Sequence, residues 1–224
     1  MQRSIELGQR RAAIVGAAVW LVGGYLACGA LLRNASTPAY MVATPYETAI
    51  PFVPASVWPY TVLLWGTLPL AIWRLYRQDN AIRIAFGLCV AGLLHFVVFL
   101  TYPMPYPRPP LAVDGSHLTV LPYAVWTLPG DALSSRLVAQ LHTLDAAAAT
   151  FPSLHVMLPT YFTLAFWRQS QSWAIGFLTI TLVLYVTTLT TKQHFIVDGP
   201  AGALVACMFF ALCEHHAARR TLRR

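Results

Sequence analysis

Two short stretches of this 224-residue chain contain the residue types that covalent catalysis uses. In Lys192 to Gly199, His194 and Asp198 are spaced to stand one helical turn apart, so that the carboxylate can orient the imidazole and stabilise its positive form. In Phe151 to His155, a Pro-Ser turn precedes a second histidine, which can supply a proton opposite a nucleophile. The sequence therefore predicts a catalytic site in two halves that the fold must bring together.

Composition indicates that this site lies in a membrane protein. Hydrophobic residues make up 57% of the chain, charged residues make up 10%, and the mean hydropathy is +0.57, which leaves too little polar surface for a soluble domain. We expect an all-α integral membrane fold, a six-transmembrane-helix bundle with an extracytoplasmic interfacial helix and loops. The spans are predicted at about residues 12–32, 57–73, 84–101, 155–168, 173–190 and 198–213. A cleaved signal peptide is the alternative for the first run, but that run is long enough to span.

The basic residues predict the orientation of these spans. The formal charge is +7, and the basic residues are distributed among apolar runs. This placement fits membrane topology better than nucleic-acid binding. With the N-terminus in the cytoplasm, the four basic residues on the opposite side are Arg33, Arg108, Arg136 and Lys192. The cytoplasmic segments contain Arg3, Arg10, Arg11, Arg74, Arg77, Arg83, Arg168, Arg219, Arg220, Arg223 and Arg224. Both termini are therefore expected in the cytoplasm, and both histidine stretches on the extracytoplasmic side.

The predicted spans also set the depth of the site. The helix from His155 to Arg168 is about 20 Å long, whereas the hydrocarbon core of a bilayer is about 30 Å thick. His155 would then lie below the membrane surface, where an ionisable group needs a partner and usually marks function. A site at headgroup depth suits a lipid that carries a phosphate.

A proline-rich segment from Tyr102 to Pro110 surrounds a single arginine, Arg108. Prolines hold such a segment stiff and extended, so the guanidinium is presented at a fixed place. A fixed arginine can grip a phosphate with two parallel hydrogen bonds. An ordinary surface arginine in a loop is the alternative that this segment alone leaves open.

Three other segments outside the spans have weaker signals. Residues 33–58 are rich in proline and are expected to form a loop or a re-entrant segment at the interface. The stretch to Gly130 is expected to be irregular. Residues 134–149 have apolar side chains at helical spacing, which predicts an amphipathic helix along the membrane surface.

The remaining histidines belong to neither stretch. His95 lies inside the third span, and a hydrogen bond to a neighbouring helix is a simpler explanation for it than function. The others are expected to be solvated or interfacial; they are His117, His142, His215 and His216.

The two histidine stretches resemble motifs of a known family. Pro152-Ser153-Leu154-His155 and His194-x-x-x-Asp198 resemble the second and third motifs of the type 2 phosphatidic acid phosphatase (PAP2) superfamily, and Arg108-Pro109 resembles the end of its first. The sequence around these motifs, including Ile50 to Pro54, is similar to the branch that contains inositol phosphorylceramide synthases. Sphingomyelin synthases resemble it more distantly. The resemblance covers roughly residues 45 to 205 and implies six membrane helices and a metal-independent site.

The resemblance also implies a role for each residue. His194 would attack phosphorus to form a phosphohistidine, Asp198 would orient it, and His155 would protonate the leaving oxygen. Arg108, Lys192 and the Ser153 hydroxyl would bind the phosphate, whose negative charge grows in the transition state. The first motif of the family has a lysine where this chain has Thr101, and the third has a Ser-Arg pair where this chain has Thr187 and Thr188. Lys192, the only lysine in the chain, is a candidate replacement.

We therefore expect one membrane domain over residues 1–224, with residues 1–11 cytoplasmic, the bundle over 12–214 and a basic tail over 215–224. The resemblance implies an enzyme of the bacterial inner (plasma) membrane that cleaves a lipid phosphate or pyrophosphate without a cofactor. The acceptor can be water, as in a phosphatase, or an alcohol, as in a headgroup phosphotransferase. A metal site is one alternative, but the two histidines and Asp198 lack the spacing of known zinc sites. A transporter or scaffold that keeps the fold without catalysis is the other alternative.

Overall fold

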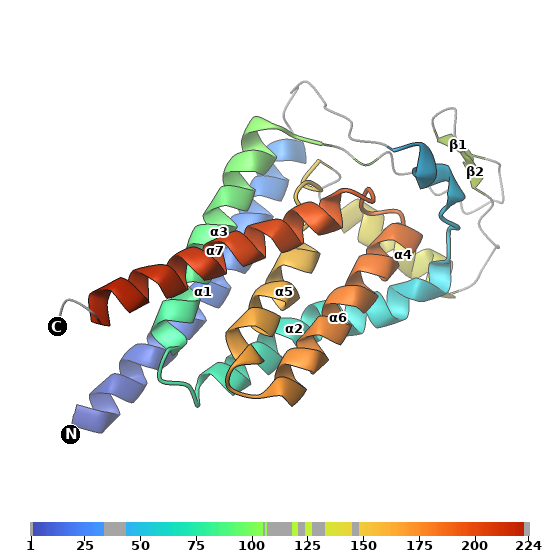
Figure 1. The fold of residues 1–224 in the computed structure, drawn as a ribbon. Coiled ribbons are helices and arrows are strands. Elements are labelled where there is room, and N and C mark those ends of the chain that lie inside the picture. The colour runs from blue at the N-terminus through green and yellow to red at the C-terminus, as the bar shows by residue number, and fades with distance from the viewer. Residues whose placement is uncertain are drawn as a thin grey trace.

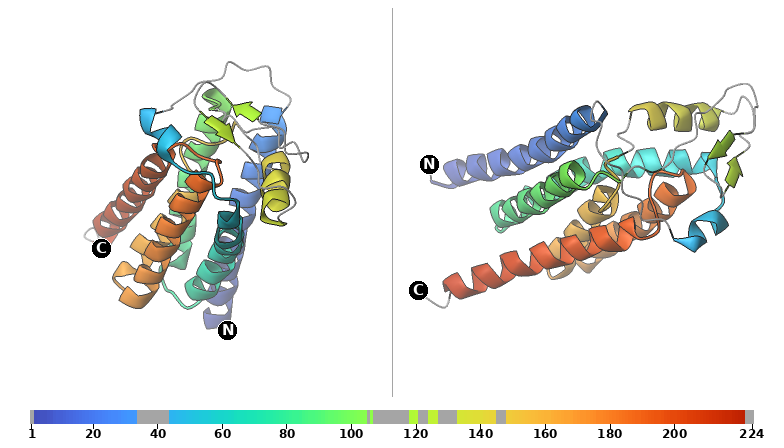
Figure 2. Two further views of the ribbon diagram at one scale, coloured as in Figure 1. Left: turned by 90° about the vertical axis from the view of Figure 1, so that its right-hand side faces the viewer. Right: turned by 90° about the horizontal axis from the view of Figure 1, so that it is seen from above.

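The computed structural model describes residues 2–33, 44–104, 106, 118–120, 124–126, 133–144 and 148–221. Helices form at all six positions expected from hydropathy, and they lie together in one bundle (Figure 1). These helices are α1 (Gln2–Arg33), α2 (Val57–Leu75), α3 (Ala81–Thr101), α5 (Leu154–Trp167), α6 (Gln171–Thr190) and α7 (Asp198–Thr221). The start of α1 and the end of α7 lie at the same end of the bundle (Figures 1 and 2).

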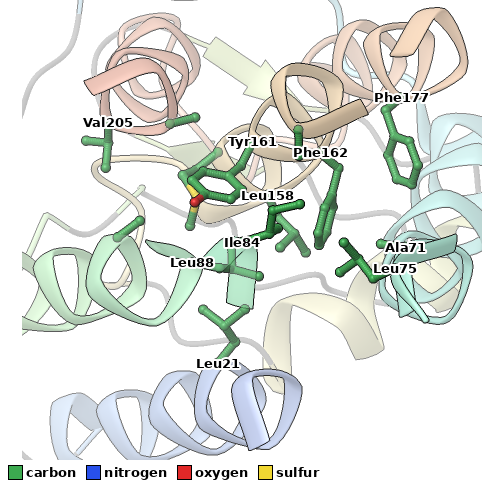
Figure 3. Packing of buried hydrophobic residues seen from close by; sticks show 14 of the residues in the cluster. Leu21, Ala71, Leu75, Ile84, Leu88, Leu158, Tyr161, Phe162, Phe177 and Val205 are labelled. Atoms are coloured by element: carbon green, nitrogen blue, oxygen red, sulfur yellow. The ribbon is translucent and has the colours of Figure 1, made fainter. Parts of the chain in front are cut away.

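Helix α5 occupies the centre of the bundle. It packs mainly against α6 and α7, while α1 packs against α3. Figure 3 shows Leu158, Tyr161 and Phe162 of α5 between side chains of α3, α7 and α2. Ten of the fourteen residues of α5 are buried, which explains why its apolar pattern has no polar face. A helix surrounded in this way holds His155, its second residue, in a fixed position.

The outside of the bundle is apolar. Trp65, Phe86 and Leu204 expose 71%, 66% and 68% of their surfaces, as is usual for helices that face lipid. Among the described residues, four helical segments are long and apolar enough to cross a membrane. They are Glu6–Leu32, Pro54–Leu75, Ala81–Thr101 and Gln171–Thr190. The helical membrane fold is thus confirmed, while the count of six spans remains a prediction, because α5 has only fourteen residues.

Short elements gather at the end of the bundle away from the termini (Figure 2). The proline-rich segment before α2 forms two short 3₁₀ helices, η1 (Pro45–Ala49) and η2 (Pro54–Ser56). The amphipathic helix α4 (Leu133–Leu144) forms at the predicted place, and it packs against α2 and η2. Its position along a membrane surface remains a prediction.

One expectation about this end is wrong. The stretch to Gly130 was predicted to be irregular, but β1 (Leu118–Val120) and β2 (Ala124–Trp126) form an antiparallel pair. Thr119 faces Val125 in the register, and both are β-branched residues that favour strands. Three residues are too few for a hydropathy pattern to reveal a strand.

Candidate active site

The segment between α6 and α7 holds the first half of the site. Backbone hydrogen bonds continue beyond Thr190 and wind the chain into a tight turn, in which Lys192 adopts a left-handed conformation with φ of 58°. His194 therefore lies in this turn, and Asp198 is the first residue of α7. The one-turn helical spacing expected for the pair is thus wrong. The two residues meet because Asp198 folds back over the turn that precedes its helix.

Asp198 holds His194 and the turn at once. Its Oδ2 atom accepts a hydrogen bond from Nδ1 of His194 and another from the backbone N–H of Phe195, both at 2.9 Å. The carboxylate is fully buried and His194 is 3% exposed. An acidic side chain at the start of a helix is also favoured by the helix dipole. The orientation of the His194 ring is consequently fixed by α7.

The second half of the site lies at the start of α5. The backbone N–H of Ser153 donates to the carbonyl oxygen of Asp198 at 3.0 Å, which joins the Pro-Ser turn to α7. Gly202 of α7 faces the Ser153 carbonyl so closely that a side chain there would collide with it. This contact places Nδ1 of His155 at 2.9 Å from Nε2 of His194, and the Ser153 hydroxyl at 3.4 Å from the same nitrogen. The two stretches predicted from the sequence are thus brought together.

Tyr60 of α2 was not anticipated from the sequence. Its hydroxyl lies 3.0 Å from Nε2 of His155, and the tyrosine is 2% exposed. The buried positions of α2 are one helical face, which includes Val57, Tyr60 and Thr67. That periodicity could have shown that Tyr60 points into the bundle, but not which residue it meets.

Lys192 is buried beside the site. Its Nζ atom donates to the carbonyl oxygen of Ile50 at 2.7 Å, and the residue is 1% exposed. Burial lowers the pKa of the ammonium to about 8, and the nearby Glu47 carboxylate opposes that shift. Lys192 is thus a cation that titrates close to neutral pH.

Glu47 and Tyr106 are further residues that sequence reasoning missed. Oε1 of Glu47 accepts a hydrogen bond from the backbone N–H of Ile196 at 2.9 Å, which ties η1 to the His194 turn. The Tyr106 ring packs on Phe195 with a centroid distance of 4.6 Å. Burial, together with the carboxylates of Glu47 and Asp198, raises the pKa of the Tyr106 phenol. Both contacts join segments far apart in sequence, so no local pattern could reveal them.

The predicted phosphate-binding residues are only partly placed. Arg108 lies outside the described residues. Thr101, Thr187 and Thr188 stand where the family motifs have a lysine and a Ser-Arg pair. Their hydroxyls donate to the carbonyl oxygens of Val97, Leu184 and Tyr185, respectively. These threonines are used within their own helices and add no positive charge to the site.

Two other histidines have defined partners, and one of these partners differs from expectation. Nδ1 of His95 donates to the carbonyl of Ala91 in its own helix at 2.8 Å, where a bond to a neighbouring helix was expected. Nε2 of His142 on α4 donates to the carbonyl of Thr191 at 2.8 Å, so this residue is not simply solvated. His142 links α4 to the turn that contains Lys192 and His194.

Comparison with known proteins identifies the family of the chain. The arrangement is that of an apolar helical bundle with a buried His-His-Asp cluster at one end. A family model described as PAP2 superfamily matches residues 39–212, and the chain belongs to this superfamily. Membership indicates phosphatase or phosphotransferase activity in general, a phosphorylated lipid substrate and association with a membrane. Searches of curated proteins and of solved structures found no match.

Proposed function

We propose that this protein is a membrane enzyme that cleaves a lipid phosphoester or pyrophosphate through a phosphohistidine intermediate. The observation that carries the proposal is the row of contacts from His155 through His194 to Asp198, in which each pair of facing atoms is 2.9 Å apart. All three residues are at least nine-tenths buried. A carboxylate that orients an imidazole beside a second imidazole is an arrangement for nucleophilic attack with acid-base assistance.

The reaction has two steps. First, the lone pair on Nε2 of His194 forms a bond to phosphorus, the bond from phosphorus to the leaving oxygen breaks, and that oxygen takes a proton from His155. Second, water or an alcohol attacks phosphorus, its proton passes to His155, and the N–P bond returns its electron pair to His194. Asp198 stabilises the positive charge that His194 gains in the first step. No metal or cofactor is required for either step.

The phosphate oxygens would be held by Arg108, Lys192 and Ser153. Ser153 supports this role because its hydroxyl lies beside the proposed attacking nitrogen. Tyr106 packs on Phe195, so the chain passes the His194 turn two residues before Arg108. Lys192 lies in the turn itself, and its ammonium can move from the Ile50 carbonyl to a phosphate oxygen.

The topology proposed here has six spans, cytoplasmic termini and an extracytoplasmic site in the bacterial inner membrane. It is supported by the start of α1 and the end of α7, which lie at the same end of the bundle, while α5 and α7 begin at the opposite end, with His155 and Asp198 in their first turns (Figures 1 and 2). Two ion pairs agree with it, since Arg10 pairs with Asp79 and Arg83 pairs with Glu214, both at 2.8 Å and all four residues in segments predicted to be cytoplasmic or next to them. The whole chain, residues 1–224, is proposed to form one domain.

A second candidate is a headgroup phosphotransferase similar to the inositol phosphorylceramide synthase branch. It is favoured by the threonines at 101, 187 and 188, which leave the site with fewer cations than the family motifs provide. A phosphodiester carries one negative charge, whereas a phosphomonoester near neutral pH carries about −1.5 to −2. A site with fewer cations is better matched to the diester.

A labelled-lipid panel separates these candidates. The purified protein would be incubated in detergent with ³²P-labelled phosphatidate, prenyl pyrophosphate and phosphatidylinositol, with and without a lipid alcohol such as diacylglycerol or ceramide. A phosphatase releases inorganic phosphate from a monoester or pyrophosphate without the alcohol. A transferase converts the phosphodiester only when the alcohol is present. Binding without turnover of any member would support a transporter or scaffold and would contradict the proposed enzyme.

A further inference from the structure

The hydroxyl of Tyr60 is the group that faces the distal nitrogen of His155. Their separation is 3.0 Å, the two ring centroids are 5.5 Å apart, and both residues are at least nine-tenths buried. The other nitrogen of the same ring, Nδ1, faces Nε2 of His194. His155 is therefore held between an α2 side chain and the proposed nucleophile, with one ring nitrogen directed at each.

Counting protons along this row gives each contact a direction. A neutral imidazole has one N–H and one lone pair. His194 must carry its proton on Nδ1, where it faces the Asp198 carboxylate, so its Nε2 bears the lone pair. Two lone pairs at 2.9 Å would repel, and hence Nδ1 of His155 carries the proton and Nε2 of His155 accepts one from Tyr60.

The demand on this nitrogen reverses during the reaction. A histidine that acts as an acid is an imidazolium with a proton on both nitrogens, so the neutral ring of His155 takes one proton from water on Nε2 before the first step. After Nδ1 has given its proton to the leaving oxygen, the remaining proton is on Nε2, and Nδ1 has the lone pair needed to receive a proton from water or alcohol. A hydroxyl can donate to Nε2 in the resting state and accept from it in the working state, because it rotates freely.

We propose that Tyr60 is a positioning residue that pairs with Nε2 of His155 in both of its protonation states. Through this pairing, Nδ1 remains the nitrogen that exchanges protons at the phosphorus bound to His194. The proposal rests on the proposed function, since it assigns His155 the acid-base role. It extends that function to α2, a helix that contributes to none of the family motifs seen in the sequence.

The first test compares substrates whose leaving groups differ in their need for a proton. In Tyr60→Phe, Nε2 of His155 loses a buried partner, so we expect kcat/KM for phosphatidate in mixed micelles to fall about 10- to 100-fold. The leaving oxygen of p-nitrophenyl phosphate needs little protonation, so loss of general-acid catalysis should lower kcat/KM for this substrate by less than about threefold. An equal loss with both substrates would show a merely structural role and overturn the proposal.

The matched control is Tyr161→Phe. Tyr161 is a fully buried tyrosine on α5, six residues after His155, and its hydroxyl faces Gly87 of α3 instead of the cluster. The Tyr161→Phe variant loses a hydroxyl oxygen from a buried site, as Tyr60→Phe does, so kcat/KM of this variant should change equally for both substrates. A selective loss with phosphatidate in this variant as well would remove the support for Tyr60.

The second test does not depend on activity. In ¹⁵N-histidine-labelled protein at a pH where His155 is neutral, its signal can be identified by its loss in His155→Gln. We expect a protonated Nδ1 and an unprotonated, hydrogen-bonded Nε2, with the Nε2 shift moving in Tyr60→Phe but not in Tyr161→Phe. A protonated Nε2 in the resting protein, or no shift in Tyr60→Phe, would overturn the proposal. Absence of turnover with this tautomer present would instead count against the proposed function alone.

Discussion

Nδ1 of His155 lies 2.9 Å from Nε2 of His194, so the proposed acid rests on the nitrogen that is proposed to attack phosphorus. A phosphoryl group must enter between these two atoms for the reaction to begin. His155 is then next to the leaving oxygen as soon as the substrate is bound. Proton transfer by His155 and attack on phosphorus by His194 are thus two separate roles, which substrates with different leaving groups can distinguish.

Replacing His155 should stall the reaction after the first step when the leaving group is good. In His155→Gln, cleavage of phosphatidate should fall by about 10²- to 10⁴-fold, because acid assistance is lost. With ³²P-labelled p-nitrophenyl phosphate, one equivalent of nitrophenol should still be released. The ³²P-labelled phosphoenzyme should then accumulate, because His155 is also the base of the second step. A variant that forms no labelled enzyme with either substrate would contradict this division of roles.

Asp198→Asn should separate orientation from charge. An asparagine oxygen can still accept the hydrogen bonds from His194 and from the backbone of Phe195, so thermal unfolding should change little. Activity should fall by about 10³- to 10⁴-fold, because the amide does not stabilise an imidazolium. Steady-state kinetics and a melting curve on the same preparation measure both effects. Full activity in this variant would show that the carboxylate charge has no part in the reaction.

The charge on Lys192 should make phosphate binding depend on pH. Its pKa is lowered to about 8, so the ammonium is present below that pH and is lost above it, and affinity should decrease as the pH rises through 8. The unfolded chain keeps this proton up to the usual pKa of lysine, so between pH 8 and that value it binds more protons than the folded chain. The free energy of unfolding therefore rises with pH over this range. Weaker binding with unchanged or greater stability is therefore the expected signature.

Two variants check this origin. Lys192→Met keeps the volume of the buried side chain and should remove the decrease in affinity near pH 8. Glu47→Gln keeps an oxygen for the Ile196 N–H but removes the charge that raises the pKa of Lys192, so the decrease should move to lower pH. If Lys192→Met binds substrate like the original protein at every pH, Lys192 is not part of the phosphate site.

Gly202 should be intolerant of any side chain. A methyl group there would collide with the carbonyl oxygen of Ser153, and backbone on both sides leaves little room to adjust. Gly202→Ala should therefore force α7 away from the Pro-Ser turn, separate His155 from His194 and lower both activity and melting temperature. Gly176→Ala on α6 is the control, because nothing lies within 4 Å of the added atom. That variant should be slightly stabilised by about 1 kcal/mol of helix propensity. Equal behaviour of the two variants would contradict the packing described here.

Much of this architecture could be predicted from the sequence because it is set by local patterns. Apolar runs of about 20 residues define the helices, and the distribution of arginines predicts that His155 and His194 share one end. The spacing of His194 and Asp198 correctly predicted their contact but not its form, because periodicity cannot show that a helix begins at the second residue of the pair.

The missing parts depend on contacts between distant segments. Tyr60 precedes His155 by 95 residues, and Glu47 precedes Ile196 by 149. A tyrosine on an apolar helix and a glutamate in a proline-rich loop have no local signal that distinguishes them from ordinary interface residues. Their relation to the site follows from how α2 and η1 pack against the His194 turn, which only the folded structure reveals.

Chemical trapping of the intermediate tests the proposed mechanism most directly. The protein would be mixed with ³²P-labelled phosphatidate, prenyl pyrophosphate or phosphatidylinositol, quenched within milliseconds, and digested to locate the label. We predict an acid-labile, base-stable label on the peptide that contains His194, at up to one equivalent, and none in His194→Ala. Turnover of any of these lipids by His194→Ala at the rate of the original protein, or label on another residue, would contradict the proposed phosphohistidine.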